Sequence, residues 1–263
     1  MNIMQSKNSG HKMPSSKIIL SPTEIEGVRQ SGKINTHLLD YISTKLYVGM
    51  TTLEINTLIH EETIRLGGSP ATLDYNGYPM SLCTSINDQV CHGIPSEKVK
   101  LKEGDIINID VSTEYKGYFS DSARVFTIGK VSKANARLVN IAKEAIYVGL
   151  KEVKPWTSMQ NVGKVISQFA NLNGYTVARG IGGHGIGKKF HEEPYVSYES
   201  HGTNMLMVPG MVFTIEPAIN KGTANVFEDA DNGWTIYTDD FAPSAQWEVT
   251  VLVTEEGYEI LAK

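Results

Sequence analysis

The chain has 263 residues, of which 41% are hydrophobic and 20% charged, and its formal net charge is -5. Such a length and composition belong to a globular protein with a substantial core and exclude an extended disordered chain. The negative charge gives no electrostatic reason to expect binding to nucleic acid or to an anionic membrane.

The signals for a cellular compartment point in one direction. The two cysteines, Cys83 and Cys91, are too few for a disulfide framework or a thiolate zinc finger, which favours a reducing compartment. No apolar run reaches the length of a membrane span, and residues 1–20 lack the apolar segment of a signal peptide. We expect a cytoplasmic protein without a membrane partner, with a loose N-terminal arm over residues 1–20.

Four helices are predicted along the chain. Ser21-Pro22-Thr23-Glu24 is typical of a helix start, and apolar residues then recur at helical spacing until a stop before Gly49. The next helix starts after Thr51 and stops at Gly67-Gly68. In the second half, apolar residues at helical spacing predict one helix around residues 138–148 and another around 162–169.

Five strand-like runs lie between and after these helices. They are rich in β-branched residues and cover residues 81–86, 106–111, 123–128, 211–215 and 249–253. Helices and strands alternate while several strand pairs look hairpin-linked. The sequence therefore predicts an α+β fold with a mixed, mainly antiparallel sheet whose outer face is covered by helices.

An internal repeat divides the chain after the arm. Each landmark in the first half has a counterpart 106 positions later, including two capping-box patterns and two glycines that would end helices. The pairs are Thr51 and Thr157, Glu54 and Gln160, Gly68 and Gly174, Gly104 and Gly210, and Asp110 and Glu216. We predict one domain over residues 21–263, with related halves at about 21–130 and 131–263 that meet at a pseudo-two-fold axis.

Five residues that could bind metal are the strongest chemical signal. Four are carboxylates in apolar strand-like settings, where desolvation is costly unless a partner or a metal compensates for it. They are Asp110, Asp121, His184, Glu216 and Glu248. This hard, anionic set suits a pair of divalent cations better than a single zinc bound by thiolates. Asp110 and Asp121 flank a turn-like stretch, so both could lie on one face of a hairpin.

His184 lies in a run of glycines, residues 180–187, which could let backbone approach a ligand closely. A flexible loop is the plain alternative. The run also matches the Gly-x-Gly-x-x-Gly pattern of a nucleotide loop, but the segment after it is a poor helix start and offers no acid about 20 positions on. His92 and His191 lie beside turn residues, where we expect them at surface clefts as substrate-facing donors.

Six motifs together resemble those of the type I methionine aminopeptidases. In chain order they are residues 91–95 (CHGIP), 108–111 (NIDV), 183–187 (GHGIG), 190–194 (FHEEP), 213–217 (FTIEP) and 244–248 (SAQWE). The resemblance runs from about residue 21 to the end. It implies the pita-bread fold, whose two related halves agree with the repeat.

The resemblance also implies a role for each site residue. The five ligands would bind two divalent ions, Co, Mn, Fe or Zn, with Asp121 and Glu248 bridging them and Glu216 also moving a proton. His92 and His191 would face the substrate. The methionine pocket would consist of Tyr75, Tyr78, Cys83, Phe190 and Trp234, with Thr72 where a cysteine is common. A monovalent-cation site for Na or K would use the carbonyls of Asn87, Gln89 and Ser244.

The implied activity is removal of the initiator methionine from nascent polypeptides with a small second residue, by a monomer near the ribosomal exit tunnel. Alternatives are a proline aminopeptidase-like or other pita-bread metallohydrolase, and a non-catalytic pita-bread binding protein. Trp247 and Val249 depart from the Phe or Tyr and the His that are common in relatives, and we expect both to alter the surroundings of the metal ligands.

Overall fold

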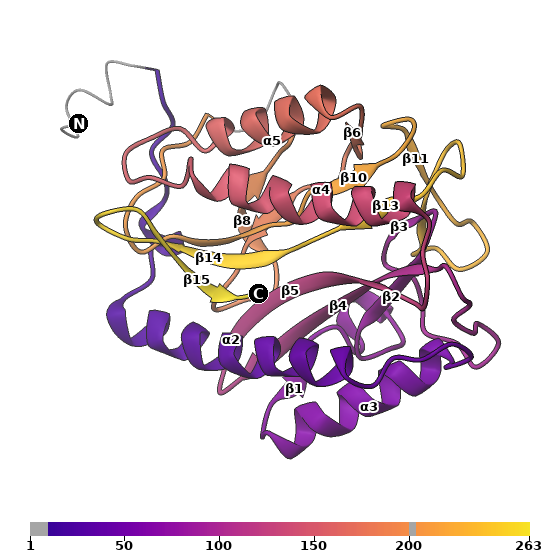
Figure 1. The fold of residues 1–263 in the computed structure, drawn as a ribbon. Coiled ribbons are helices and arrows are strands. Elements are labelled where there is room, and N and C mark those ends of the chain that lie inside the picture. The colour runs from indigo at the N-terminus through magenta and orange to yellow at the C-terminus, as the bar shows by residue number, and fades with distance from the viewer. Residues whose placement is uncertain (1–9, 200–203) are drawn as a thin grey trace.

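The structure, a computed structural model, describes residues 10–199 and 204–263, and its strands lie between two pairs of helices (Figure 1). The helices α2 (Pro22–Ser43) and α3 (Thr52–Arg65) cover one side, and α4 (Lys133–Leu150) and α5 (Gln160–Leu172) cover the other. Each pair packs on its own apolar core, so the two halves are built alike. Two short 3₁₀ helices are η1 (Ser16–Ile18) and η2 (Tyr75–Gly77).

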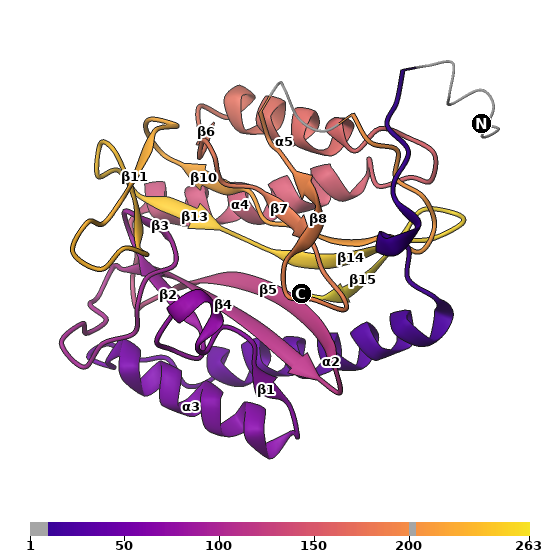
Figure 2. The ribbon, with the colours of Figure 1, turned by 180° about the vertical axis from the view of Figure 1, so that it is seen from behind.

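The strands of the first half are β1 (Ser69–Pro70), β2 (Cys83–Ile86), β3 (Gln89–Cys91), β4 (Ile106–Tyr115) and β5 (Tyr118–Thr127). Those of the second half are β6 (Thr176–Val177), β7 (Gly183–Gly185), β8 (Glu192–Val196), β9 (Val212–Ile215), β10 (Ala218–Asn220), β11 (Val226–Glu228), β12 (Ile236–Thr238), β13 (Ser244–Gln246), β14 (Val249–Val253) and β15 (Tyr258–Ala262). Figure 2 shows them from behind.

Every pairing between these named strands is antiparallel, which confirms the mainly antiparallel α+β prediction. In the first half, β4 pairs with β1, β2 and β5. In the second half, five strands follow the order β15-β14-β9-β7-β8. Two three-stranded sheets, β13-β10-β6 and β11-β12-β3, complete the arrangement, and the second joins strands from both halves.

The predicted helix starts are correct in the first half and wrong for α5. Capping boxes with Ser21 and Thr51 open α2 and α3, as the sequence indicates. By contrast, α5 begins at Gln160 without a side-chain cap. Thr157 instead donates its hydroxyl proton to the carbonyl of Lys154 at 2.9 Å, because the chain turns there before the helix begins.

Of the two glycines predicted to end helices, Gly174 is correct and Gly68 is wrong by one position. Gly174 follows α5 with φ 81°, as a C′ glycine does. After α3 the left-handed residue is Gly67, at φ 80°, and Gly68 comes one position later. The repeat is clearest next to the ligands, where Gly104 and Gly210 have φ 92° and 93° and lead into β4 and β9.

A short seam joins the two halves through the strands that hold Asp121 and Glu248. The backbone N–H of Glu248 donates to the carbonyl of Ala123 at 2.9 Å. The hydroxyl of Thr250 accepts from the N–H of Asp121 at 3.0 Å and donates to its carbonyl at 2.7 Å. The side-chain amide of Asn108 donates to the carbonyl of Gln246. These bonds hold the two halves together where the segments that carry Asp121 and Glu248 meet.

Part of the segment expected to be loose is attached to the second half. The backbone of Lys12 accepts from Leu206 and donates to Asn204, both at 2.9 Å. Leu20 is buried, and Ile19 packs against the core beneath α4 and α5. The prediction of a loose arm is therefore wrong for residues 12–20, while residues 1–9 lie outside the described part of the chain.

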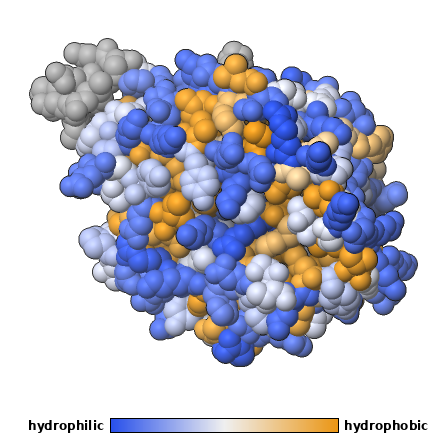
Figure 3. Space-filling model, viewed as in Figure 1, coloured by the Kyte–Doolittle hydropathy of each residue, from blue (hydrophilic) through white to orange (hydrophobic). Residues whose placement is uncertain are grey.

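Hydrophobic and hydrophilic residues are interspersed on the face shown in Figure 3. Within residues 10–199 and 204–263, no helix is both long and apolar enough to cross a membrane.

The close approach of α5 to the segment after β8 gives a test of the fold. A Cβ on Gly163 would lie 1.9 Å from the carbonyl oxygen of Ser197, and this oxygen belongs to backbone that cannot easily shift. We expect Gly163→Ala to lower the free energy of unfolding by about 1–3 kcal/mol in urea titrations. Lys164→Ala, at the neighbouring exposed position, should change it by less than about 0.5 kcal/mol. Equal effects of both variants would contradict this account.

Candidate active site and metal centre

The hairpin of β4 and β5 presents two carboxylates on one face. Asp110 lies opposite Ala123, and Ser112 lies opposite Asp121. Since side chains alternate along a strand and directly paired residues share a face, Asp110, Ser112 and Asp121 point the same way. The Ser112 hydroxyl donates to Oδ1 of Asp121 at 2.9 Å. The structure thus brings the two predicted ligands together as the sequence indicated.

His184 is held in β7 by close packing of strands. A Cβ on Gly183 would lie 2.2 Å from the carbonyl oxygen of Thr214, and one on Gly185 would lie 2.0 Å from that of Glu193. These glycines therefore let neighbouring backbone approach, and the expectation that they serve approach to a ligand is wrong. The segment after β7 leads to β8 and contains no helix, which also rules out the nucleotide loop.

Glu216 directly follows β9, and Glu248 directly precedes β14, the strand that pairs with β9. Val249 lies opposite Ile215, so Glu248 and Glu216 are adjacent at the end of this ladder. The seam bond from the Glu248 N–H to Ala123 brings this pair to β5 and Asp121. Each half thus supplies two carboxylates, and the second half adds His184.

The resulting cluster fits divalent cations. Nε2 of His184 lies 3.7 Å from Oδ2 of Asp121 and 3.7 Å from Oε1 of Glu216. One ligand atom each of Asp121, His184 and Glu248 lie within 4.8 Å of one another. Oδ1 of Asp110 and Oε1 of Glu248 are buried and have no hydrogen-bond partner among the described residues. Buried carboxylate oxygens without partners are costly unless a cation binds them.

The pKa values of the cluster show the same cost. Burial raises the pKa of Asp121 to about 7 and that of Glu216 to about 8. Burial, reinforced by the nearby carboxylates, holds the pKa of Asp110 and Glu248 well above their usual range. Without a cation, the site therefore retains protons at neutral pH, and a bound cation has to displace them.

A cavity of about 310 Å³ opens over the cluster and contains all the predicted ligands and substrate-facing residues. Its lining consists of Thr72, Tyr75, Asn76, Tyr78, Cys83, His92, Asp110, Ser112, Asp121, His184, Phe190, His191, Glu216, Trp234 and Glu248. Aromatic rings form one wall, with ring centroids 4.7 Å apart for Tyr75 and Phe190 and 5.1 Å apart for Tyr78 and Trp234. The sequence did not indicate Asn76 or Ser112 as lining residues.

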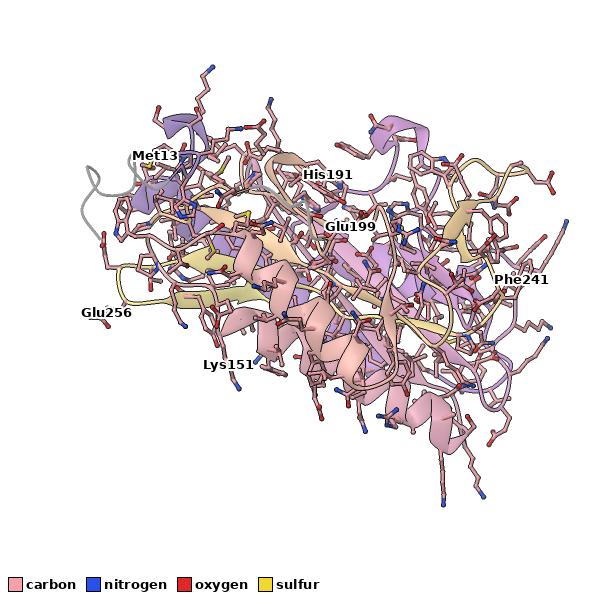
Figure 4. All side chains as sticks on the ribbon, turned by 90° about the horizontal axis from the view of Figure 1, so that it is seen from above. Met13, Lys151, His191, Glu199, Phe241 and Glu256 are labelled. Atoms are coloured by element: carbon pink, nitrogen blue, oxygen red, sulfur yellow. The ribbon has the colours of Figure 1, made fainter. Side chains whose placement is uncertain are left out.

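Two histidines face the cluster from different segments. His191 precedes β8, and its ring centroid is 4.0 Å from that of His184 (Figure 4 marks His191). His92 follows β3 with a left-handed φ of 57° and stands edge-on to Trp234 at 6.4 Å. Burial, with His184 and His92 nearby, lowers the pKa of His191 to about 3, and burial also lowers the pKa of His92. Both rings are therefore neutral N–H donors at pH 7.

The three residues of the predicted monovalent-cation site are close in space. The backbone N–H of Ser244 donates to the carbonyl of Asn87 at 2.8 Å, and Gln89 begins β3 two residues later. Asn87 has a left-handed φ of 55°. Carbonyl oxygens can accept more than one partner, so this geometry leaves the site as a prediction.

The sequence analysis did not predict three buried hydroxyl groups that lie beside the ligands. They belong to Ser112, Thr214 and Thr250, and each bonds to Asp121 or Glu216. Each lies two positions from Asp110, Glu216 or Glu248 in its strand, so the alternation of strand faces could have found them. Gln246 was also missed, and its amide donates to Oε2 of Glu216 at 3.2 Å.

The loop carrying Trp234 depends on Asn232. Its side-chain oxygen accepts from the N–H groups of Trp234 and Thr235, both at 2.9 Å, and its amide donates to Asp229 at 2.7 Å. The local Asx-turn chemistry of an Asp-Asn-Gly sequence could have indicated this loop.

The two departures at 247 and 249 lie away from the ligands. Val249 is buried in the core beneath α4, and Trp247 packs against the same core. Nζ of Lys143, on α4, lies 5.0 Å from the centroid of the Trp247 ring. Because side chains alternate, Glu248 faces the cavity while both neighbours face α4. Both side chains therefore lie on the opposite side of this segment from the predicted ligand, and their effect on the metal site stays a prediction.

Comparison with known proteins agrees with a metal-dependent hydrolase. The family described as Metallopeptidase family M24 matches residues 26–255. The chain belongs to this family.

Within the family, the chain lies among the methionine aminopeptidases, which have the pita-bread fold. It is 43% identical over 246 residues to the methionine aminopeptidase of Buchnera aphidicola, covering 93% of each chain. The crystal structure of the methionine aminopeptidase from Rickettsia prowazekii matches with a TM-score of 0.91 and 37% identity, over 93% of this chain and 99% of that chain. The prolidase from Pyrococcus furiosus matches at 22% identity and TM-score 0.77, over 94% of this chain and 65% of that one, which shows a shared fold alone.

The raised pKa values predict how stability depends on pH without metal. The folded protein holds protons on Asp121 and Glu216 that the unfolded chain releases above its ordinary carboxyl pKa, so stability falls as pH rises from about 4 to about 8. We expect metal-free protein to melt at a lower temperature at about pH 8 than at about pH 5, and Mn²⁺ to raise the melting temperature most at the higher pH.

Glu216→Gln is the matched variant for this measurement, because it removes one titrating carboxyl and keeps its shape. Its melting temperature without metal should depend less on pH than that of the wild type. A melting temperature that rises steadily from pH 5 to pH 8 in metal-free wild type would contradict the assignment.

Proposed function

We propose that the protein removes the initiator methionine from nascent polypeptides whose second residue is small. The observation that carries the proposal is a single cavity in which a carboxylate-rich metal cluster adjoins an aromatic pocket. A hydrolase of this kind needs both, since one part activates water and the other selects the side chain.

In this proposal, two divalent cations would be held by the five predicted ligands, Asp110, Asp121, His184, Glu216 and Glu248. Mn, Fe, Co and Zn all accept such ligands, and availability in the cell decides among them. When bound, the cations supply Lewis acidity that makes water nucleophilic at neutral pH. We also assign a Na or K ion to the carbonyls of Asn87, Gln89 and Ser244.

The neutral histidines then act on the substrate. His191, assisted by His92, donates an N–H to the carbonyl oxygen of the scissile bond as negative charge develops there. Because burial lowers the pKa of both rings, both stay uncharged at neutral pH and do not repel the cations that the site would bind. Glu216 accepts a proton and passes it to the leaving amine.

The aromatic wall selects methionine. Tyr75, Tyr78, Phe190 and Trp234 offer ring edges and faces on which a polarizable thioether packs well. Burial raises the pKa of the Cys83 thiol, so this residue remains a neutral, apolar part of the wall. The proposed location is the cytoplasm, with a monomer acting on nascent chains near the ribosomal exit tunnel.

Two alternatives are less well supported. A proline aminopeptidase-like enzyme would share the ligands, but the relative with high identity and coverage is a methionine aminopeptidase. A non-catalytic binding protein would be free to lose ligands, whereas all five line the cavity here.

The role of His191 can be tested apart from metal binding. We expect His191→Ala to lower kcat by about 10²–10³, as loss of one oxyanion donor typically does, while metal content stays unchanged. Metal content by emission spectroscopy and turnover of a Met-Ala peptide would be measured together. His11→Ala, at a histidine outside the cavity, is the control. A parallel loss of metal in His191→Ala would make this residue a ligand instead.

Substrate choice tests the second part of the proposal. A small cavity with the metal cluster at its base leaves little room for a large second side chain, so Met-Ala peptides should be cut more than about tenfold faster than Met-Leu peptides. Competition between the two peptides in one reaction measures the ratio of kcat/KM directly. Equal cleavage of the two, or efficient cleavage of Leu-Ala peptides, would indicate a broad-specificity aminopeptidase.

A further inference from the structure

Thr214 joins two predicted metal ligands through one hydroxyl group. It is fully buried in β9, and its Oγ1 accepts from the backbone N–H of His184 at 2.9 Å. The same oxygen lies 2.7 Å from Oε1 of Glu216. His184 lies on β7 and Glu216 follows β9, so the hydroxyl spans two neighbouring strands of the sheet.

The direction of these hydrogen bonds is determined by the number of available protons. The N–H of His184 can only donate, so the hydroxyl oxygen must accept there. Its single proton is then left for Glu216, whose Oε1 accepts it. The hydroxyl therefore holds the carboxylate in one orientation and ties it to the backbone beside the histidine.

The remaining contacts of Glu216 complete this restraint. Oε2 accepts from the amide of Gln246 at 3.2 Å, and the backbone N–H donates to the hydroxyl of Tyr198 at 2.6 Å. Glu216 is thus held at both carboxylate oxygens and at its backbone. Glu248, by contrast, has one buried oxygen without a partner among the described residues. The shortest of the bonds to the Glu216 carboxylate is the one from Thr214.

We propose that Thr214 is a positioning residue that locks His184 and Glu216 into one preformed metal-binding unit. Ligands already held in place lose less freedom when a cation binds, which raises affinity. The proposal rests on the metal-binding part of the proposed function. It does not depend on which peptide is the substrate.

The test compares metal affinity across variants that differ by one group. Thr214→Val keeps the shape and removes the hydroxyl, whereas Thr214→Ser keeps the hydroxyl and removes the methyl. Metal-free protein would be titrated with Mn²⁺ in a calorimeter. We expect Thr214→Val to bind Mn²⁺ about 10–100-fold more weakly and Thr214→Ser to bind it nearly as the wild type does.

Thr113→Val is the control for a buried threonine, because the hydroxyl of Thr113 has no partner among the described residues. Its Mn²⁺ affinity should equal that of the wild type. If Thr214→Val fails to fold, Thr214→Ala is compared with Thr214→Ser, since both lack the methyl and only one keeps the hydroxyl. Thr214→Ala should then show the weaker binding.

The outcomes separate this inference from the proposed function. Wild-type protein that binds no Mn²⁺, Co²⁺, Fe²⁺ or Zn²⁺ would overturn both. Wild-type binding with equal affinity in Thr214→Val would overturn the positioning role alone. Equal weakening in Thr214→Ala and Thr214→Ser would assign the effect to packing of the methyl group and would also overturn it.

Discussion

Mutual repulsion among four clustered carboxylates, two of them buried and two half-buried, is the constraint around which this structure is organised. Like charges a few ångströms apart in a poorly solvated site repel strongly, and each also loses its hydration. The cluster meets this cost with one imidazole, a few hydroxyl and amide donors, and raised pKa values. These donors do not suffice, because one oxygen of Asp110 and one of Glu248 have no hydrogen-bond partner within residues 10–199 and 204–263. Divalent cations are the natural counter-charge, and this explains why the site belongs to a metallopeptidase.

Holding such a cluster requires rigid supports from two directions. Each half contributes paired strands backed by its own helices. Asp110, Asp121 and His184 lie in strands, and Glu216 and Glu248 lie at the ends of the paired strands β9 and β14. The seam joins these ladders by one main-chain bond, from Glu248 to Ala123, and by the bonds of the Thr250 hydroxyl to the backbone of Asp121. Because each half supplies two carboxylates, the packing of the halves against each other brings the predicted ligands together.

The chemistry of the cavity follows from its position at this convergence. One wall is polar and anionic, and the other is built from stacked and edge-on rings. Two neutral histidines lie where the walls meet. In the proposed function, a substrate that places its side chain on the rings would present its first peptide bond to the predicted metal ligands. The same cavity would therefore both select the side chain of the substrate and hydrolyse its peptide bond.

The sequence by itself determined the ligand types, the antiparallel α+β class and the local helix starts of the first half. These features depend on residue type and short-range periodicity, which are visible in a linear chain. The six motifs, which include those around His184, Glu216 and Glu248, also indicated the methionine aminopeptidases, because they occur in order.

Only the tertiary structure showed which residues from distant parts of the chain pack against one another. It showed that the glycines around His184 admit strand backbone, that Trp247 and Val249 face α4, and that residues 12–20 are attached. It also placed the hydroxyl of Thr214 between two ligands from different strands. Such contacts join residues 30 positions apart, and no short-range pattern in the sequence records which strands become neighbours.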